Sequence, residues 1–144
     1  MLEIMKKLAK DKDICVLATA SSGTPYCSLM AYATDEECRE IYMVTYRNSQ
    51  KYKNLKENPS VSLLVDTREE HTGPHRAEAK AMTIAGTFRK IEDPHREAMV
   101  RGKLLLRHPH LKPFLEAADG EIICIRIASF LLLDGLTEAH FEEI

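Results

Sequence analysis

Three residues with phosphate-binding chemistry lie close together between Tyr42 and Lys51. Thr45 and Ser49 supply hydroxyl groups, and Lys51 supplies a full positive charge. They lie where a short apolar strand is predicted to turn into a helix, whose first turn presents unpaired N–H groups and the positive end of the helix dipole. This combination suits a phosphate monoester. The same residues also fit an ordinary helix start, with Asn48 or Ser49 as the N-cap and Lys51 in solvent.

The residues before this turn predict one helix and an antiparallel hairpin. Residues 2–11 carry apolar side chains at helical spacing with lysines between them. The short apolar run 14–19 fits a buried strand, and residues 26–33 alternate as a second strand. The Gly- and Pro-containing segment 21–25 joins the two as a hairpin turn. A third strand, over 41–45, then leads into the hydroxyl-rich turn.

A helix is predicted directly after the turn, because Tyr52 and Leu55 share one apolar face. It ends at Asn58, since the residue before proline avoids helical geometry. Gly86 is expected to mark a bulge or a close backbone approach within a later strand. The acidic tail from residue 137 onward carries no clear pattern. The remaining elements are predicted as strands over 61–65, 81–91 and 121–133, and as helices over 94–106, after an Asp-Pro start, and 109–118.

A long polar loop is expected over residues 67–80, and loops of this length in small domains are typically lids or mobile segments. It contains His71 and His75, but a metal or haem site would need a further ligand that the sequence does not locate. A solvated loop is the simpler interpretation. If the loop folds over a bound cofactor, His75 or Arg76 could contact substrate.

Six main strands joined largely by tight turns, with helices that interrupt rather than alternate, predict a mainly β fold. We expect an antiparallel barrel with peripheral α-helices. No Gly-x-Gly-x-x-Gly or Walker pattern is present, which disfavours a nucleotide held by such loops. The length of 144 residues fits a single domain over 1–144.

Composition restricts the partners and the location that we expect. The chain is 44% hydrophobic and 29% charged, which is typical of a folded domain. Its net charge is −2 and no polybasic patch is visible, so nucleic acid and membrane are not expected as partners. No apolar run approaches the roughly 20 residues that span a bilayer. The N-terminus does not resemble a secretory signal, and a cytoplasmic location is therefore expected.

The cysteine spacings match no zinc pattern, and three of the four cysteines lie in apolar strand-like runs. We therefore expect reduced packing residues, with Cys38, in an acidic turn, as the most exposed. His95, His108 and His110 lie near predicted helix starts and are expected at the surface. Tyr26, Tyr32 and Tyr46 are expected to serve barrel or interface packing rather than acid–base catalysis.

The order of these elements resembles the pyridoxamine 5′-phosphate oxidase-like family of FMN-binding split barrels. The matching residues are Thr45, Ser49 and Lys51, followed by the segment Asn-Pro-Ser-Val-Ser-Leu-Leu at 58–64. The similarity covers roughly residues 2–91, and the strand from Glu121 fits the same plan. The resemblance implies a six-stranded antiparallel split β-barrel of Greek-key type.

The resemblance also implies where FMN binds. Ser49 and Lys51 correspond to the ligands of the flavin phosphate, and Thr45 to a strand-end hydroxyl near the ribityl chain or the phosphate. The backbone of residues 28–30 corresponds to the strand that packs against the isoalloxazine edge. The cofactor-binding residues implied are Ser28, Leu29, Met30, Val44, Thr45, Ser49, Gln50 and Lys51.

The chain departs from pyridoxamine phosphate oxidases proper at several positions. Those enzymes carry basic residues on the second strand and an arginine before the lysine of the turn, whereas this chain has Ser28-Leu29-Met30 and Gln50. It also lacks their arginine-bearing C-terminal segment. These differences argue against oxidation of pyridoxamine phosphate and leave flavin binding intact.

The family resemblance implies a homodimer with flavin at the subunit interface, formed by apolar surface on the second and last strands. The first functional hypothesis is an FMN-dependent oxidoreductase acting on a small-molecule substrate or electron donor. The alternatives are a non-enzymatic flavin-binding or electron-transfer module, and a barrel adapted to haem or a deazaflavin.

Overall fold

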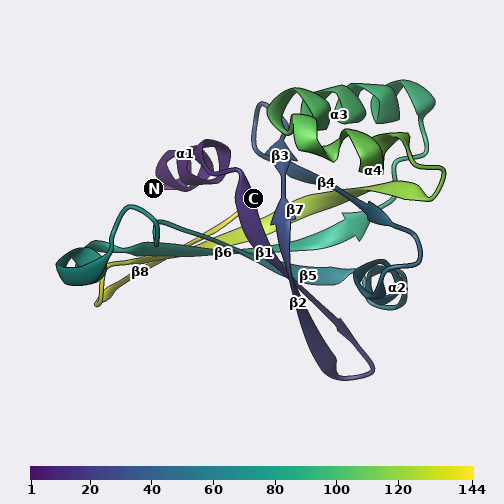
Figure 1. Ribbon diagram of the computed structural model, residues 1–144. Helices are drawn as coiled ribbons and strands as arrows, with labels where there is room; N and C mark the ends of the chain where they lie inside the picture. Colours follow the sequence, from purple (N-terminus) through teal and green to yellow (C-terminus); the bar gives the residue numbers. More distant parts are fainter.

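A computed structural model describes residues 1–144, in which eight strands form one curled antiparallel sheet (Figure 1). The strand order is β2-β1-β5-β6-β7-β4-β3, and β8 pairs with β7 outside this path. The predicted mainly β split barrel is confirmed, with β3 and β8 as short additions to the six expected strands. The strands are β1 (Ile14–Ser21), β2 (Thr24–Ala31), β3 (Ala33–Thr34), β4 (Glu40–Tyr46), β5 (Ser60–Asp66), β6 (Lys80–Arg89), β7 (Gly120–Asp134) and β8 (Glu138–Glu143).

The helices lie at the periphery of the sheet, and the helices expected from the sequence are present (Figure 1). The third α-helix begins as predicted: the Asp93 side chain accepts a hydrogen bond from the His95 N–H, and proline occupies the first helical position. None of the helices is both long and apolar enough to cross a bilayer. The helices are α1 (Leu2–Asp11), α2 (Gln50–Glu57), α3 (Pro94–Arg107) and α4 (Lys112–Glu116), with 3₁₀ turns η1 (Gly73–Glu78) and η2 (Pro109–Leu111).

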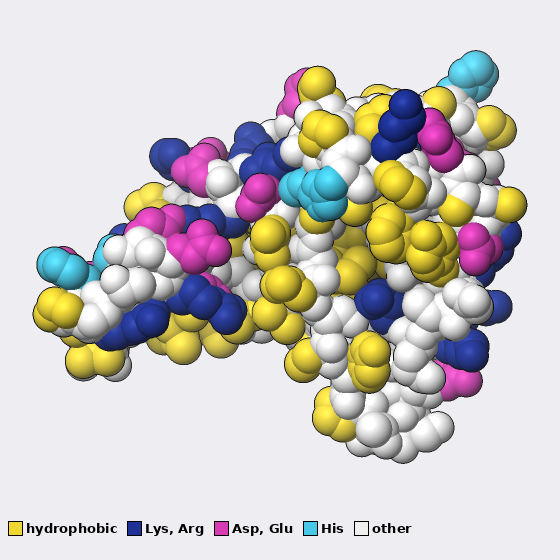
Figure 2. Space-filling view, viewed as in Figure 1, with side chains coloured by type: hydrophobic (Ala, Val, Ile, Leu, Met, Phe, Trp, Pro, Cys, Tyr) yellow, Lys and Arg dark blue, Asp and Glu magenta, His cyan; other side chains and the backbone are white.

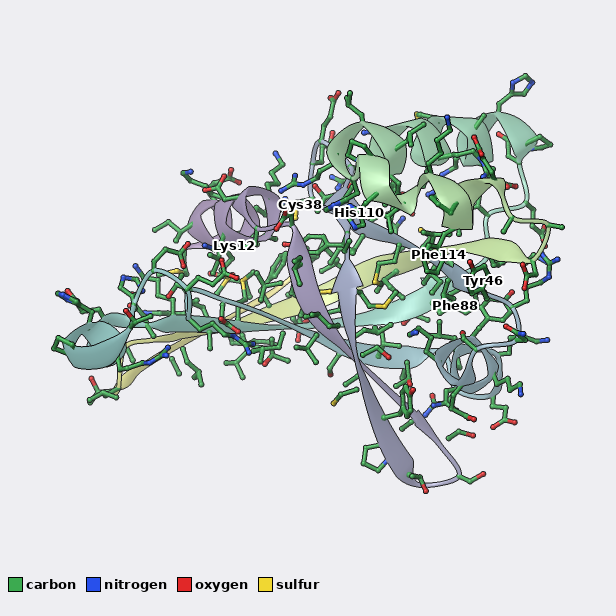
Figure 3. All side chains as sticks on the ribbon, in the orientation of Figure 1. Lys12, Cys38, Tyr46, Phe88, His110 and Phe114 are labelled. Carbon is green, nitrogen blue, oxygen red and sulfur yellow. The ribbon has the colours of Figure 1, made fainter.

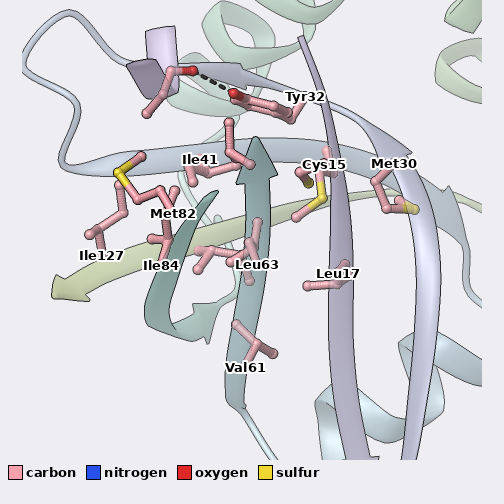
Figure 4. Close-up of a cluster of buried hydrophobic side chains, with 14 of the residues drawn as sticks. Cys15, Leu17, Met30, Tyr32, Ile41, Val61, Leu63, Met82, Ile84 and Ile127 are labelled. Carbon is pink, nitrogen blue, oxygen red and sulfur yellow. Dashed lines mark hydrogen bonds between the residues drawn. The ribbon is translucent and has the colours of Figure 1, made fainter. Parts of the chain in front are cut away.

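The interior of the curled sheet holds the main hydrophobic core, part of which is drawn in Figure 4. Met30 of β2 and Met43 of β4 belong to this one cluster although their strands lie near opposite ends of the sheet order. The sheet therefore closes on itself around the cluster. On β7, alternate residues such as Ile123 and Ile125 face this core, while Ile122 and Cys124 pack in a second cluster with residues of α3 and α4.

Gly86 marks both a bulge and a close backbone approach, as expected. The register of β6 against β7 shifts between Ala85 and Gly86. A Cβ atom on Gly86 would lie 2.6 Å from the Ile125 Cγ2 atom and 2.7 Å from the Arg126 carbonyl oxygen. Only glycine fits this position without displacing a neighbour.

Two expectations about exposure are wrong. Cys38 is fully buried in the main core, where burial raises its pKa to about 11, and Cys27 on β2 is the exposed cysteine. The turn that carries Cys38 folds this side chain inward, and a local acidic sequence does not reveal that. His108 is also buried, and its Nε2–H donates a hydrogen bond of 2.8 Å to the Tyr32 carbonyl oxygen. His95 and His110 are exposed, as predicted.

The loop at 67–80 contains η1 and is fixed at its base. The Lys80 N–H donates to the Thr67 hydroxyl oxygen at 2.8 Å, and the Thr67 N–H donates to the Lys80 carbonyl at 2.9 Å. Helix α2 lies just before the start of β5, and the loop follows the end of β5. A strand of 7 residues, such as β5, spans about 20 Å. Figure 1 shows η1 and α2 at opposite ends of the sheet. Within one chain the loop therefore does not cover the turn at residues 45–51.

Candidate cofactor-binding site

The turn between β4 and α2 is built around one serine. Ser49 is the N-cap of α2, and its Oγ atom accepts a hydrogen bond from the Tyr52 N–H at 3.2 Å. The Thr45 hydroxyl donates to the same Oγ atom at 3.2 Å. Thr45 is buried at the end of β4, so the strand fixes its side chain against the cap. Ordinary helix capping, the simpler interpretation of this sequence, is thus present.

Capping leaves several hydrogen-bond donors of the turn unused. The Ser49 oxygen accepts two hydrogen bonds, so its own O–H is available to an outside acceptor. Gln50 and Lys51 are the first two residues of α2, where backbone N–H groups have no acceptor within the helix. Lys51 is a half-buried residue, and its ammonium takes part in none of the ion pairs of the structure. These groups suit the oxygens of a phosphate monoester, and capping and phosphate binding are compatible.

A buried polar network that the sequence analysis missed holds α2 against the barrel. The Gln50 side-chain amide donates to Asn54 Oδ1 at 2.8 Å, and the Asn54 amide donates to Thr19 Oγ1 of β1 at 3.1 Å. Asn54 and Thr19 are both buried. The sequence signal for this network is Asn54, a polar residue that lies with Tyr52 and Leu55 on the buried face of the helix. The network orients the first turn of α2 relative to the sheet.

Val44 differs from the other residues predicted around this turn. Its side chain packs in the cluster beneath α3 and α4. Thr45, Ser49, Gln50 and Lys51 lie together in the turn, whereas Val44 can offer a ligand only its backbone.

The three predicted residues on β2 have different orientations. Ser28 and Met30 pair with Leu17 and Cys15 of β1, whose side chains line the main core. Leu29 points to the outer face and is 74% exposed. Because β2 is an edge strand that pairs only with β1, the backbone groups of its other edge are free to meet a ring system.

Residues 28–30 lie on β2, whereas residues 45–51 form the end of β4 and the start of α2. The chain passes from β2 to β3 through Tyr32 alone, and β3 pairs with the first residues of β4, so the end of β2 lies close to the start of β4. Figure 1 shows the two strands diverging from there, β4 towards α2 and β2 towards its hairpin turn. Leu29 also lines a separate outer pocket of about 270 Å³, to which none of the turn residues contributes.

Aromatic side chains surround the turn on the face shown in Figure 3. Tyr46 stacks on Phe114 of α4 with ring centroids 4.6 Å apart, and Tyr52 meets Phe88 edge-on at 6.1 Å. Figure 2 shows hydrophobic side chains gathered between the α3–α4 helices and the β1–β2 hairpin. Tyr46 thus packs against a neighbouring aromatic ring, as expected. The structure contains no group of three or more histidine, cysteine or carboxylate side chains that could hold a metal ion.

Solved structures share this fold at low sequence identity. A haem-binding protein from Mycobacterium smegmatis has a TM-score of 0.84 and 17% identity, covering 96% of this chain and 56% of that protein. A FAD-binding protein from Mesorhizobium loti has a TM-score of 0.74 and 19% identity, covering 92% and 93%. HutZ, the haem storage protein of Vibrio cholerae, has a TM-score of 0.69 and 16% identity, covering 96% and 92%.

These similarities establish the fold and do not extend to ligands, since all three identities are below 20%. The chain spans little more than half of the Mycobacterium protein. A search of curated protein sequences found no match. The family model described as pyridoxamine 5′-phosphate oxidase matches residues 1–123. This chain therefore belongs to the pyridoxamine 5′-phosphate oxidase family.

Proposed function

We propose that this protein binds FMN through the turn between β4 and α2 and uses it to transfer hydride or electrons. The observation that carries the proposal is the set of donors that capping leaves free. These are the Ser49 hydroxyl, the N–H groups of Gln50 and Lys51, and the Lys51 ammonium. A phosphate monoester needs such a set of converging donors, and FMN carries one at the end of its ribityl chain.

The residues of the chain bind and orient the cofactor, and bound FMN would supply the redox chemistry. In this proposal Lys51 and Ser49 hold the phosphate, and Thr45 fixes the Ser49 hydroxyl. The free edge of β2 at Ser28, Leu29 and Met30 faces the ring. No side chain is assigned as a catalytic acid or base.

The substrate that we propose is a small molecule or electron donor other than pyridoxamine phosphate. The second strand offers Ser28, Leu29 and Met30, none of which is basic, and Gln50 precedes the lysine of the turn. A second phosphorylated molecule would therefore find few positive charges on this strand. Turnover with a reduced nicotinamide and an electron acceptor would distinguish an oxidoreductase from a passive flavin carrier.

We also propose that two chains form a homodimer with the cofactor sites at its interface. One cross-strand row on the outer face runs through β2, β1, β5, β6, β7 and β8, and only its threonine is polar. Phe141 is 57% exposed in this row, and Leu131 is also exposed. An exposed apolar row that crosses so much of a sheet is typical of an interface. The row consists of Leu29, Val16, Leu64, Thr83, Leu131 and Phe141.

Haem is the second candidate ligand. Two proteins of the same fold are described as a haem-binding protein and a haem storage protein, and His71 and His75 lie together in the 67–80 loop. An imidazole of the loop could supply an axial ligand. A haem site at the loop would not depend on the free donors of the β4–α2 turn, which is why we favour FMN.

Identifying the bound chromophore tests the proposal. The protein is purified from cells without added cofactor, denatured, and the released small molecule is identified by mass spectrometry and absorbance. FMN in near-stoichiometric amount is the expected result. Release of haem, with a Soret band in the native protein, would favour the second candidate. A protein that carries no chromophore and binds neither compound in titrations would contradict both.

A further inference from the structure

Glu121 places a negative charge beside the proposed phosphate site. It is the direct partner of Thr45 in the pairing of β4 with β7. Directly opposed residues in an antiparallel pair share one face of the sheet, with Cβ atoms about 5 Å apart. Thr45 in turn bonds Ser49. Glu121 is also close to Tyr52, whose pKa burial raises and the Glu121 charge raises further.

An unpaired carboxylate at this position would oppose phosphate binding. It would repel a dianion bound at Ser49, and it would compete with the phosphate for Lys51. The Glu121 side chain is only 18% exposed, so solvent screens its charge incompletely. Its single ion-pair partner is Arg47, whose guanidinium Nη1 atom lies 3.0 Å from Glu121 Oε2.

Arg47 is held in place by more than this ion pair. Its Nη2 atom donates to the Ala118 carbonyl oxygen at 2.6 Å, and its backbone N–H donates to the Asp119 carbonyl oxygen at 2.9 Å. Glycine at residue 120 lets the connection from α4 to β7 fold tightly back against the end of α4. A Cβ atom on Gly120 would lie 2.0 Å from the Phe114 carbonyl oxygen. The guanidinium is thus fixed over Glu121 by backbone contacts.

We infer that Arg47 is a positioning residue that neutralises Glu121 and so leaves Lys51 and the free donors of the turn available to a phosphate. This inference rests on the proposed binding of FMN. It assigns Arg47 no contact with the ligand, and its effect passes through the charge of Glu121. The inference therefore predicts that Arg47 matters for FMN and not for riboflavin, which lacks the phosphate.

The test compares dissociation constants for FMN and riboflavin across matched variants. Arg47→Ala should weaken FMN binding about tenfold, the effect of about 1.4 kcal/mol, and should leave riboflavin binding within about twofold. The double variant Arg47→Ala/Glu121→Gln should recover most of the lost FMN affinity. Arg39→Ala is the control, because Arg39 forms an exposed ion pair with Glu37 before the opposite end of β4.

Each outcome decides between explanations. Equal FMN affinity in wild type and Arg47→Ala would overturn the inference and leave the proposed function standing. A double variant as weak as Arg47→Ala would also overturn it, since the arginine would then act by shaping the turn. If wild type binds FMN no better than riboflavin, the proposed phosphate site itself fails, and the inference with it.

The single variant Glu121→Gln keeps the test decisive if Arg47→Ala does not fold. Removing the carboxylate leaves the Arg47 charge unpaired beside the turn, so FMN should bind equally well or a few times more tightly. Weaker FMN binding by Glu121→Gln would contradict the inference.

Discussion

Replacing Lys51 by alanine removes the one full charge that we assign to the flavin phosphate. The ammonium forms no ion pair within the chain, so its loss should leave the stability of the fold nearly unchanged. A contact between a charged donor and its acceptor contributes about 1.5–3 kcal/mol. Two unit charges 4 Å apart attract each other by about 1 kcal/mol in water, and more strongly where solvent is partly excluded. The Coulomb attraction between the Lys51 ammonium and a dianionic phosphate therefore has a magnitude similar to that of the charged contact. We therefore expect Lys51→Ala to weaken FMN binding about 10- to 150-fold.

The assay is a fluorescence titration of FMN with wild type, Lys51→Ala and the control Lys53→Ala at two salt concentrations. Lys53 is an exposed residue of the same helix, and its loss should change the affinity by less than about threefold. The wild-type affinity should fall with added salt more steeply than that of Lys51→Ala. An unchanged FMN affinity in Lys51→Ala, or an equal loss in Lys53→Ala, would refute the assignment of Lys51 to the phosphate.

Three further predictions concern the fold, the dimer and pH. Gly86→Ala should lower the free energy of unfolding by about 1–3 kcal/mol in urea, whereas Gly102→Ala, in open space on α3, should not destabilise. Leu131→Asp should shift a dimer to monomers in light scattering; a variant that stays dimeric would exclude the outer row as the interface. Burial opposes ionisation of Glu40, but hydrogen bonds from Arg96 and others lower its pKa overall. The ionised Glu40 carboxylate therefore contributes stability that is complete above pH about 4.5 and is lost as the pH falls through the lowered pKa. The free energy of unfolding should fall less steeply with decreasing pH in Glu40→Gln than in the wild type.

Much of the local structure could be predicted from the sequence because it depends on neighbouring residues. The turn at Ser49 is one case, since capping, the first helical turn and the strand end all lie within a few residues. Gly86 is another, because a glycine inside a strand pattern indicates a bulge or a close approach. The phosphate-binding part of the site is local in the same sense.

The missing parts depend on contacts between distant segments. Arg47 and Glu121 are separated by 74 positions, and nothing in either segment indicates that they pair. Cys38 and His108 are buried because of what folds over them, so short acidic or helix-end sequences suggested exposure wrongly. The β8 strand forms in a tail without apolar alternation because β7 offers it an edge.

The most direct test of the central claim is a crystal structure of the protein with bound FMN. We predict that the phosphate lies within hydrogen-bond distance of the Ser49 hydroxyl and the Lys51 ammonium, at the N-terminus of α2. A flavin bound with its phosphate elsewhere, or a turn that stays free of ligand while FMN is bound, would contradict it.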